Sequence, residues 1–95
     1  MILLFLDGVG LGDPDPTINP LAAADLPVLT RLVGSTPDRD APAHDVKDVV
    51  FRPVDATLGH DGLPQSATGQ TTILTGLNGA DIMNGHYGPW PGPTL

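Results

Sequence analysis

The chain begins with an uninterrupted apolar run, Met1-Ile-Leu-Leu-Phe-Leu6, which ends at Asp7. A short run without polar alternation is typical of a strand that is buried on both faces of a parallel sheet. Such a strand needs other strands beside it and helices over both its faces. We therefore predict a strand over residues 1–6 and an α/β fold with a mainly parallel, layered sheet.

The next segment carries a helix pattern. Asn19-Pro20 is typical of a helix start, with asparagine as the N-cap and proline at the first helical position. Leucines follow at helical spacing, and Gly34 ends the pattern. These signals predict a helix over about 20–33.

The remaining chain predicts two more elements. Residues 35–46 are polar and contain proline, which indicates an exposed connection. The stretch KDVVFRPVDA predicts a second strand over about 47–56, and a later apolar stripe predicts a helix over about 66–77. Residues 78–95 end in GPWPGPTL and are expected to be a loop.

Two strands and two helices are too few for a doubly wound sheet. Leu, Ile, Val and Phe supply 26 of the 95 residues, which exceeds the roughly 20% below which a charged chain stays unfolded. A folded but thin piece is therefore expected. We predict one incomplete domain over residues 1–95, the N-terminal fragment of a longer domain.

Charge and cysteine content exclude several classes of function. The net charge is −7, and four scattered basic residues form no stripe that could follow a phosphate backbone or an anionic membrane. No nucleic-acid or membrane partner is expected. The absence of cysteine excludes disulfides and thiolate sites, so oxygen or imidazole must hold any metal. The apolar start has no basic n-region, and we predict a cytoplasmic protein.

Two polar residues are candidates for chemistry. Asp7 follows the first predicted strand, where open α/β sheets bind ligands, and its carboxylate is a suitable metal ligand. An acid at this position can equally cap the following turn. Ser66 can be a helix N-cap, or a nucleophile in the positive field of the helix amides. Both readings remain open for each residue.

Other candidates are weaker. His86 lies between two glycines near Trp90 and is expected to contact substrate, whereas His44 and His60 are expected to be solvated loop residues. Trp90 can simply fill the core. A phosphate-binding P-loop is excluded, because Gln70 stands where that motif requires lysine.

Taken together, ILLFLDGVG and GLPQSATGQTTILTGLNG resemble segments of the alkaline-phosphatase superfamily, and in particular of its bacterial "metalloenzyme domain" proteins. These are related to cofactor-independent phosphoglycerate mutases and phosphopentomutases. The resemblance implies an alkaline-phosphatase-like layered fold and two divalent metal ions, zinc, manganese or magnesium. It implies that Asp7 binds metal and that Ser66 bridges to one metal and attacks phosphorus. The amide of Ala67 would then help to hold the phosphoryl oxygens.

The expected function is metal-dependent phosphoryl transfer on a small phosphorylated substrate, by a phosphatase or phosphomutase with a serine nucleophile. Asp7 and Ser66 are too few ligands for a binuclear site, so the 95 residues alone are expected to be inactive without a missing C-terminal half. The alternative is a non-catalytic fragment or a degenerate relative that acts only within a larger assembly.

Overall fold

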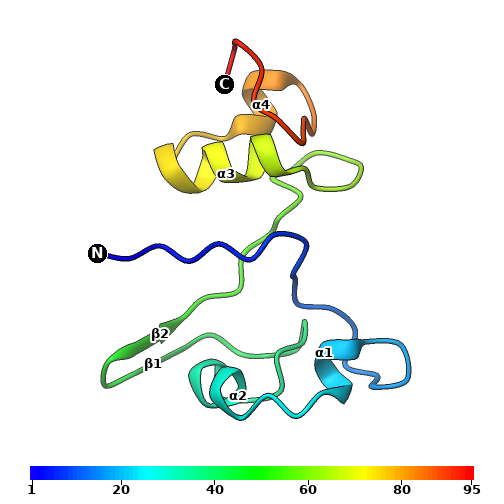
Figure 1. The fold of residues 1–95 in the computed structure, drawn as a ribbon, viewed down its shortest axis with the longest axis vertical. Coiled ribbons are helices and arrows are strands. Elements are labelled where there is room, and N and C mark those ends of the chain that lie inside the picture. Colours follow the sequence, from blue (N-terminus) through cyan, green and yellow to red (C-terminus); the bar gives the residue numbers. More distant parts are fainter. The chain divides into compact units, whose positions relative to one another are not determined.

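A computed structural model describes all residues from 1 to 95. The chain divides into two compact units, Met1–Val54 and Asp55–Leu95, and each is described by itself (Figure 1). The first unit contains α1 (Pro20–Ala23), α2 (Pro27–Val33), β1 (His44–Val46) and β2 (Val49–Phe51). The second contains α3 (Ser66–Thr75) and α4 (Gly79–Met83).

The first six residues, for which a strand was expected, form no strand (blue, Figure 1). Their side chains are exposed, with Leu3 at 59% and Leu4 at 79%. The physical reason is that a strand buried on both faces requires hydrogen-bonded neighbours. The only sheet of the chain is the two-stranded pair β1–β2, which is antiparallel. Residues 1–95 therefore contain no parallel layered sheet, and such a sheet stays a prediction.

The predicted helix over 20–33 is interrupted in the structure. As the Asn-Pro pair predicts, Asn19 caps α1 by accepting a hydrogen bond from the Leu21 amide. The helix then ends at Ala23, and α2 starts separately at Pro27. Proline disfavours helical backbone at the preceding residue, and Leu26 accordingly has φ −122° and ψ 66°. Pro27 thus divides the predicted helix in two.

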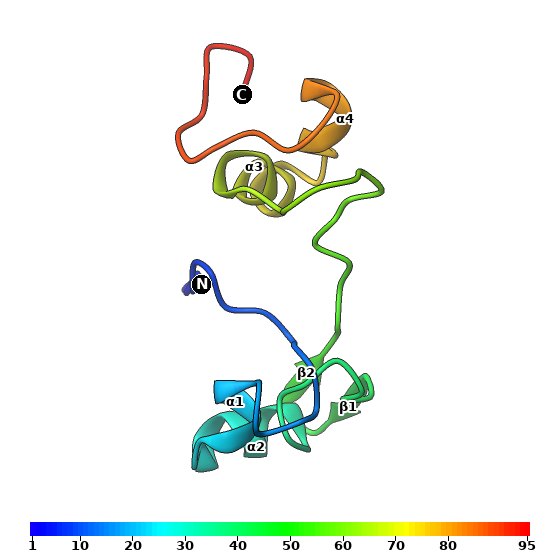
Figure 2. The same cartoon turned by 90° about the vertical axis from the view of Figure 1, so that its right-hand side faces the viewer.

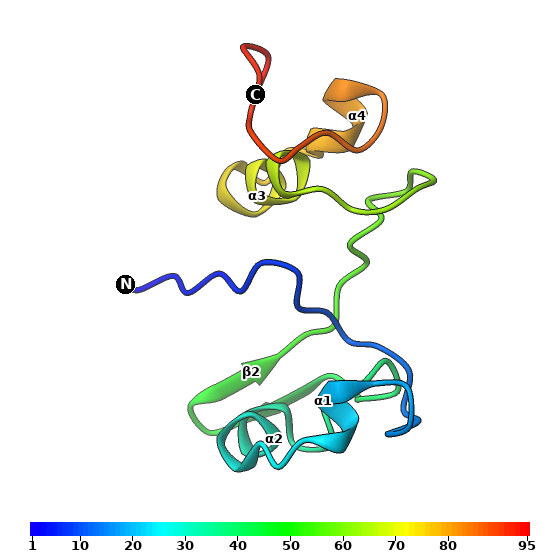
Figure 3. The same ribbon diagram turned by 45° about the vertical axis from the view of Figure 1, so that its right-hand side comes forward.

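A β-hairpin replaces the single strand expected over 47–56. β1 and β2 pair with the register His44↔Phe51 and Val46↔Val49. The two-residue turn contains Lys47 at φ 48°, the left-handed conformation that tight hairpin turns require. β1 therefore lies within the range expected to be an exposed connection, and β2 is confined to three residues. The hairpin contacts α2 through β2 (Figure 3).

Polar as well as apolar residues fill the small core of the first unit. Val33 and Ala41 are buried, and so are the polar residues Asn19 and Asp38. Asn19 donates a hydrogen bond from Nδ2 to the carbonyl of Asp13 at 2.6 Å. Because most large apolar side chains of this unit remain exposed, loop hydrogen bonds contribute much of its order.

The second unit is built on two helices in contact, α3 and α4 (Figure 2). Its core consists of Ala67, Thr68, Gly79 and Ala80, all small and buried. A helix was expected over about 66–77, and α3 occupies residues 66–75 and ends at Gly76, which is left-handed. The helix α4 lies within the segment expected to be a loop, so that expectation is wrong at residues 79–83.

The longest helix, α3, has ten residues. None of the helices combines the length and the apolar character needed to cross a membrane.

Candidate functional site

Ser66 is the first residue of α3 and is half-buried. The N-cap is Gln65, with φ −124° and ψ 150°, and its side chain accepts no helix amide. The sequence suggested Ser66 itself as the cap, so the helix starts one residue earlier than that pattern implies. As a consequence, the serine lies within the first turn, near the amides that carry the positive end of the helix dipole.

The first turn of α3 is anchored by Thr68, whose side chain is completely buried. The amide of Thr68 donates to the carbonyl of Tyr87 at 3.1 Å, and its hydroxyl donates to the carbonyl of Gln65 at 3.2 Å. The Tyr87 carbonyl, in the segment after α4, therefore accepts the hydrogen bond of a first-turn amide, which the Gln65 side chain does not. Ala67, the other predicted contact in this turn, has a buried side chain at 5% exposure.

His86, the predicted substrate contact, lies in the second unit and is half-buried. Its Nε2 is 3.4 Å from the carbonyl oxygen of His60, and its Nδ1 is buried with no hydrogen-bond partner. The ring lies beside the turn at Gly62, where an added Cβ atom would be 3.7 Å from His86 Cδ2. The structure gives His86 a packing role in this turn, and substrate contact stays a prediction.

The two histidines expected to be solvated are both partly buried. The side chain of His60 is 22% exposed, and its Nε2 lies 2.8 Å from the Asp81 carboxylate. The His44 ring packs against Phe51 in a tilted arrangement, with 5.7 Å between the ring centroids and 34° between the ring planes, and its Nε2 is buried without a hydrogen-bond partner. Burial follows from the β-hairpin and from α4, which the sequence analysis did not predict. Trp90, by contrast, is 80% exposed and does not fill the core.

Asp81 and Asn78 are residues of this unit that the sequence analysis missed. Asn78 caps α4 by accepting from the amides of Ala80 and Asp81, and its Nδ2 donates to the carbonyl of Leu58. Asn78 therefore joins α4 to the turn that contains His60. An asparagine followed three residues later by an acid is a helix-start signal, and it could have revealed α4.

Asp7 is exposed and lies in a turn of the first unit, whereas Ser66, Ala67 and His86 belong to the second. The carboxylate of Asp7 and the hydroxyl of Ser66 are oxygen donors, which suit magnesium, manganese or zinc. However, the chain brings no three His, Cys, Asp or Glu side chains together in a group that could hold a metal ion. The donor set of the 95 residues does not fit a binuclear metal site.

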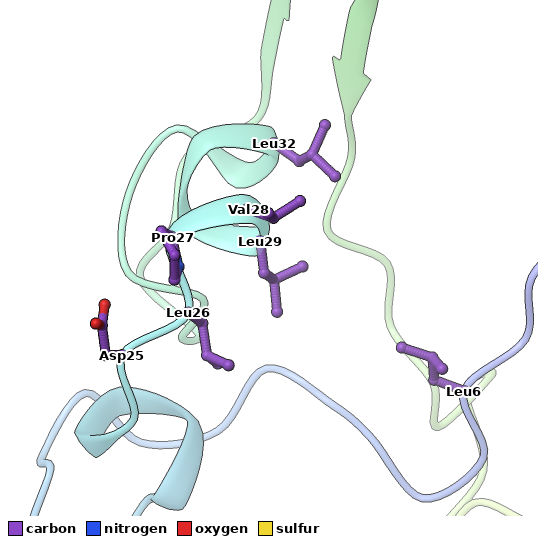
Figure 4. A pocket seen from close by; sticks show the side chains of 7 residues that line it. All are labelled: Leu6, Asp25, Leu26, Pro27, Val28, Leu29 and Leu32. Atoms are coloured by element: carbon purple, nitrogen blue, oxygen red, sulfur yellow. The ribbon is translucent and has the colours of Figure 1, made fainter.

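A shallow, open apolar pocket of about 400 Å³ lies in the first unit (Figure 4). Its lining is Leu6, Asp25, Leu26, Pro27, Val28, Leu29 and Leu32. None of the predicted site residues lines it. Its one charged group is the Asp25 carboxylate, whose negative charge repels an anionic phosphoryl group. The apolar walls also offer no groups to replace the water that solvates such an anion.

Two carboxyl groups have lowered pKa values because threonine stabilises their charged form. The pKa of Asp15 lies below its ordinary value through hydrogen bonds from the Thr17 amide at 2.8 Å and the Thr17 hydroxyl at 2.7 Å. For Asp55 the Thr57 hydroxyl at 2.7 Å is the larger cause and the Thr57 amide at 2.9 Å the smaller. Both acids are exposed and fix local turns.

Comparison with known proteins yields no relative: no protein-family model, no curated protein and no solved structure matches the chain.

Proposed function

We propose that the chain carries the nucleophilic half of a metal-dependent phosphoryl-transfer site, with Ser66 as the nucleophile. The observation that carries the proposal is the placement of Ser66 in the first turn of a ten-residue helix without a side-chain cap. Amides at a helix start favour anionic groups such as a phosphoryl oxygen. The amide of Ala67, next in the same turn, is the proposed phosphoryl contact.

In the proposed reaction, Ser66 Oγ bonds to the phosphorus of a phosphate monoester and the bond to the ester oxygen breaks. The leaving alcohol takes up the proton that the serine gives up. Water or a second hydroxyl then accepts the phosphoryl group, which distinguishes a phosphatase from a mutase. Asp7 is the proposed metal ligand from this chain, and further protein groups must complete the site for turnover. A single transfer of phosphate to Ser66 needs only this chain and the metal ion supplied in solution. A cytoplasmic location belongs to the same proposal.

The test exploits the fact that the chain contains only two serines, Ser35 and Ser66. The chain is incubated with p-nitrophenyl phosphate and Mn²⁺, Mg²⁺ or Zn²⁺ and quenched in acid, and phosphoserine is located by peptide mass spectrometry. We expect phosphate on Ser66, its loss in Ser66→Ala and its retention in the matched control Ser35→Ala. Labelling that persists in Ser66→Ala contradicts the proposal.

The second candidate is a non-catalytic part of a larger assembly. The specific observation in its favour is the exposure of the apolar N-terminal segment, together with the lack of a metal-binding group. It predicts weak, non-cooperative unfolding of the isolated chain. Cooperative unfolding together with stoichiometric Mn²⁺ binding in calorimetry speaks against it.

A further inference from the structure

The strongest unexplained feature of the second unit is a pair of hydrogen bonds between Thr68 and the backbone of Tyr87. The Thr68 amide donates to the Tyr87 carbonyl at 3.1 Å, and the Tyr87 amide approaches the Thr68 hydroxyl at 3.4 Å. That hydroxyl in turn donates to the carbonyl of Gln65. A distant segment and the residue before Ser66 are thus connected through one completely buried side chain.

The segment also approaches the serine directly at Gly88. A Cβ atom added to Gly88 would lie 3.2 Å from the amide nitrogen of Ser66 and 3.0 Å from the Cβ of Gln65. Both distances are tighter than ordinary van der Waals contact. A side chain at Gly88 therefore requires the segment or the first helical turn of α3 to shift by a few tenths of an ångström.

The other side of Thr68 is fixed by α4. The Thr72 hydroxyl donates to the Thr68 carbonyl at 2.8 Å and accepts from the Gly79 amide at 2.9 Å. A Cβ at Gly79 would lie only 2.6 Å from the same carbonyl. The first turn of α3 is therefore held on one side by Tyr87 and Gly88 and on the other by Gly79.

We infer that Thr68 and Gly88 are positioning residues for Ser66: they fix the turn that presents its hydroxyl and the neighbouring Ala67 amide. The inference rests on the proposed function for the role of Ser66. Ser66, the proposed nucleophile, and Ala67, the proposed phosphoryl contact, are adjacent in one helical turn. A shift of that turn therefore moves both residues together. Misplacement by about 1 Å can cost on the order of a hundred-fold in rate, even when no reacting group is removed.

The test compares Thr68→Val, which keeps the shape and loses the hydroxyl, with Thr68→Ser, which keeps the hydroxyl. Gly88→Ala probes the close approach, and Thr71→Val is the matched control in the same helix. Three quantities are measured on the 95-residue chain. They are the amide hydrogen exchange at Thr68 and Tyr87, the amide resonance of Ser66, and the rate at which p-nitrophenyl phosphate with Mn²⁺ labels Ser66.

We expect slow exchange of the Thr68 amide in the unsubstituted chain. Thr68→Val and Gly88→Ala should shift the Ser66 resonance and lower the maximal labelling rate about ten-fold or more, with little change in half-saturating substrate concentration. Thr68→Ser should restore the rate, and Thr71→Val should leave it unchanged.

Unprotected Thr68 and Tyr87 amides in the unsubstituted chain overturn the inference, even if a variant fails to fold. So does unaltered Ser66 labelling in both Thr68→Val and Gly88→Ala, and in that case the proposed function stands. An unsubstituted chain with a protected Thr68 amide but no label on Ser66 overturns the proposed function itself, and with it the positioning role.

Discussion

The imidazole Nε2 of His60 lies 2.8 Å from the carboxylate Oδ1 of Asp81. This contact joins a glycine-rich turn to the first turn of α4. The Asp81 side chain is 69% exposed, so water and salt weaken the interaction. We expect Asp81→Asn to lower the free energy of unfolding by no more than about 1 kcal/mol. Urea unfolding followed by circular dichroism measures this, with Asp61→Asn as the exposed control. A loss of unfolding free energy several times larger than this contradicts the prediction that exposure weakens the pair.

Thr57→Val should raise the pKa of Asp55 towards its ordinary value, since the Thr57 hydroxyl is the larger cause of the lowering. Thr17→Val should likewise raise the pKa of Asp15 but leave it lowered, because there the larger cause is the backbone amide, which the substitution keeps. Carboxyl carbon resonances followed during an acid titration measure both. Each variant serves as the control for the other, and an unchanged pKa in either variant contradicts the role of its threonine hydroxyl.

The same two carboxyl groups give the stability a defined pH dependence. Their pKa values are lower in the folded chain, so their stabilising contribution is fully present above the ordinary value of 3.8. It is lost as the pH falls through the lowered values. We expect the Asp55→Asn variant to be less sensitive to acid below pH 3.8 than the unsubstituted chain. Thermal unfolding at a series of acidic pH values tests this, and an identical acid dependence contradicts it.

Gly34→Ala should destabilise the first unit. Gly34 ends α2 at φ +83°, and an added Cβ would lie 2.7 Å from Cε1 of His44. The left-handed conformation alone costs an alanine about 1–2 kcal/mol, and the clash with the half-buried ring adds to it. Urea unfolding is the measurement, and Gly10→Ala is the control because nothing lies within 4 Å of its added Cβ. Equal stability of the two variants contradicts the described contact.

Gly79→Ala should separate α3 from α4. The added Cβ would meet the Thr68 carbonyl at 2.6 Å, and a backbone atom of a packed helix cannot move away cheaply. We expect a loss of about 1–3 kcal/mol, as for other overpacked sites. Gly69→Ala, with nothing within 4 Å, should instead stabilise the helix by about 0.5–1 kcal/mol. Relative to the unsubstituted chain, the free energy of unfolding should therefore fall in Gly79→Ala and rise in Gly69→Ala.

Local signals in the sequence predicted local structure well. The cap at Asn19 and the left-handed helix end at Gly34 depend on a few neighbouring residues, and both are present. The break at Pro27 is equally local, but the apolar residues on both sides of it keep helical spacing and therefore favour one continuous helix. Three-residue strands such as β1 are too short to produce a periodic pattern, so the β-hairpin could not be foreseen.

Features that depend on distant partners could not be predicted in this way. The apolar run at residues 1–6 satisfies the pattern of a buried strand, but pairing needs neighbours that the chain does not provide. The contacts His60–Asp81 and Thr68–Tyr87 join residues 21 and 19 positions apart. No spacing rule for helices or strands reaches that far. For the candidate site, the sequence therefore predicts Ser66, and it gives no signal for the contacts of Thr68 and Gly88.

The small size of the residues between α3 and α4 has a consequence for how this region can vary. Ala67, Thr68, Gly79 and Ala80 bring the two helices so close that backbone atoms form much of the contact. Such a contact cannot be adjusted by exchanging one bulky side chain for another, as an ordinary leucine-rich core can. Substitutions in this unit should be tolerated mainly on the outer side of α3, where Ile73 and Leu74 are exposed. A deep mutational scan should show this as a narrow intolerant strip beside a permissive surface.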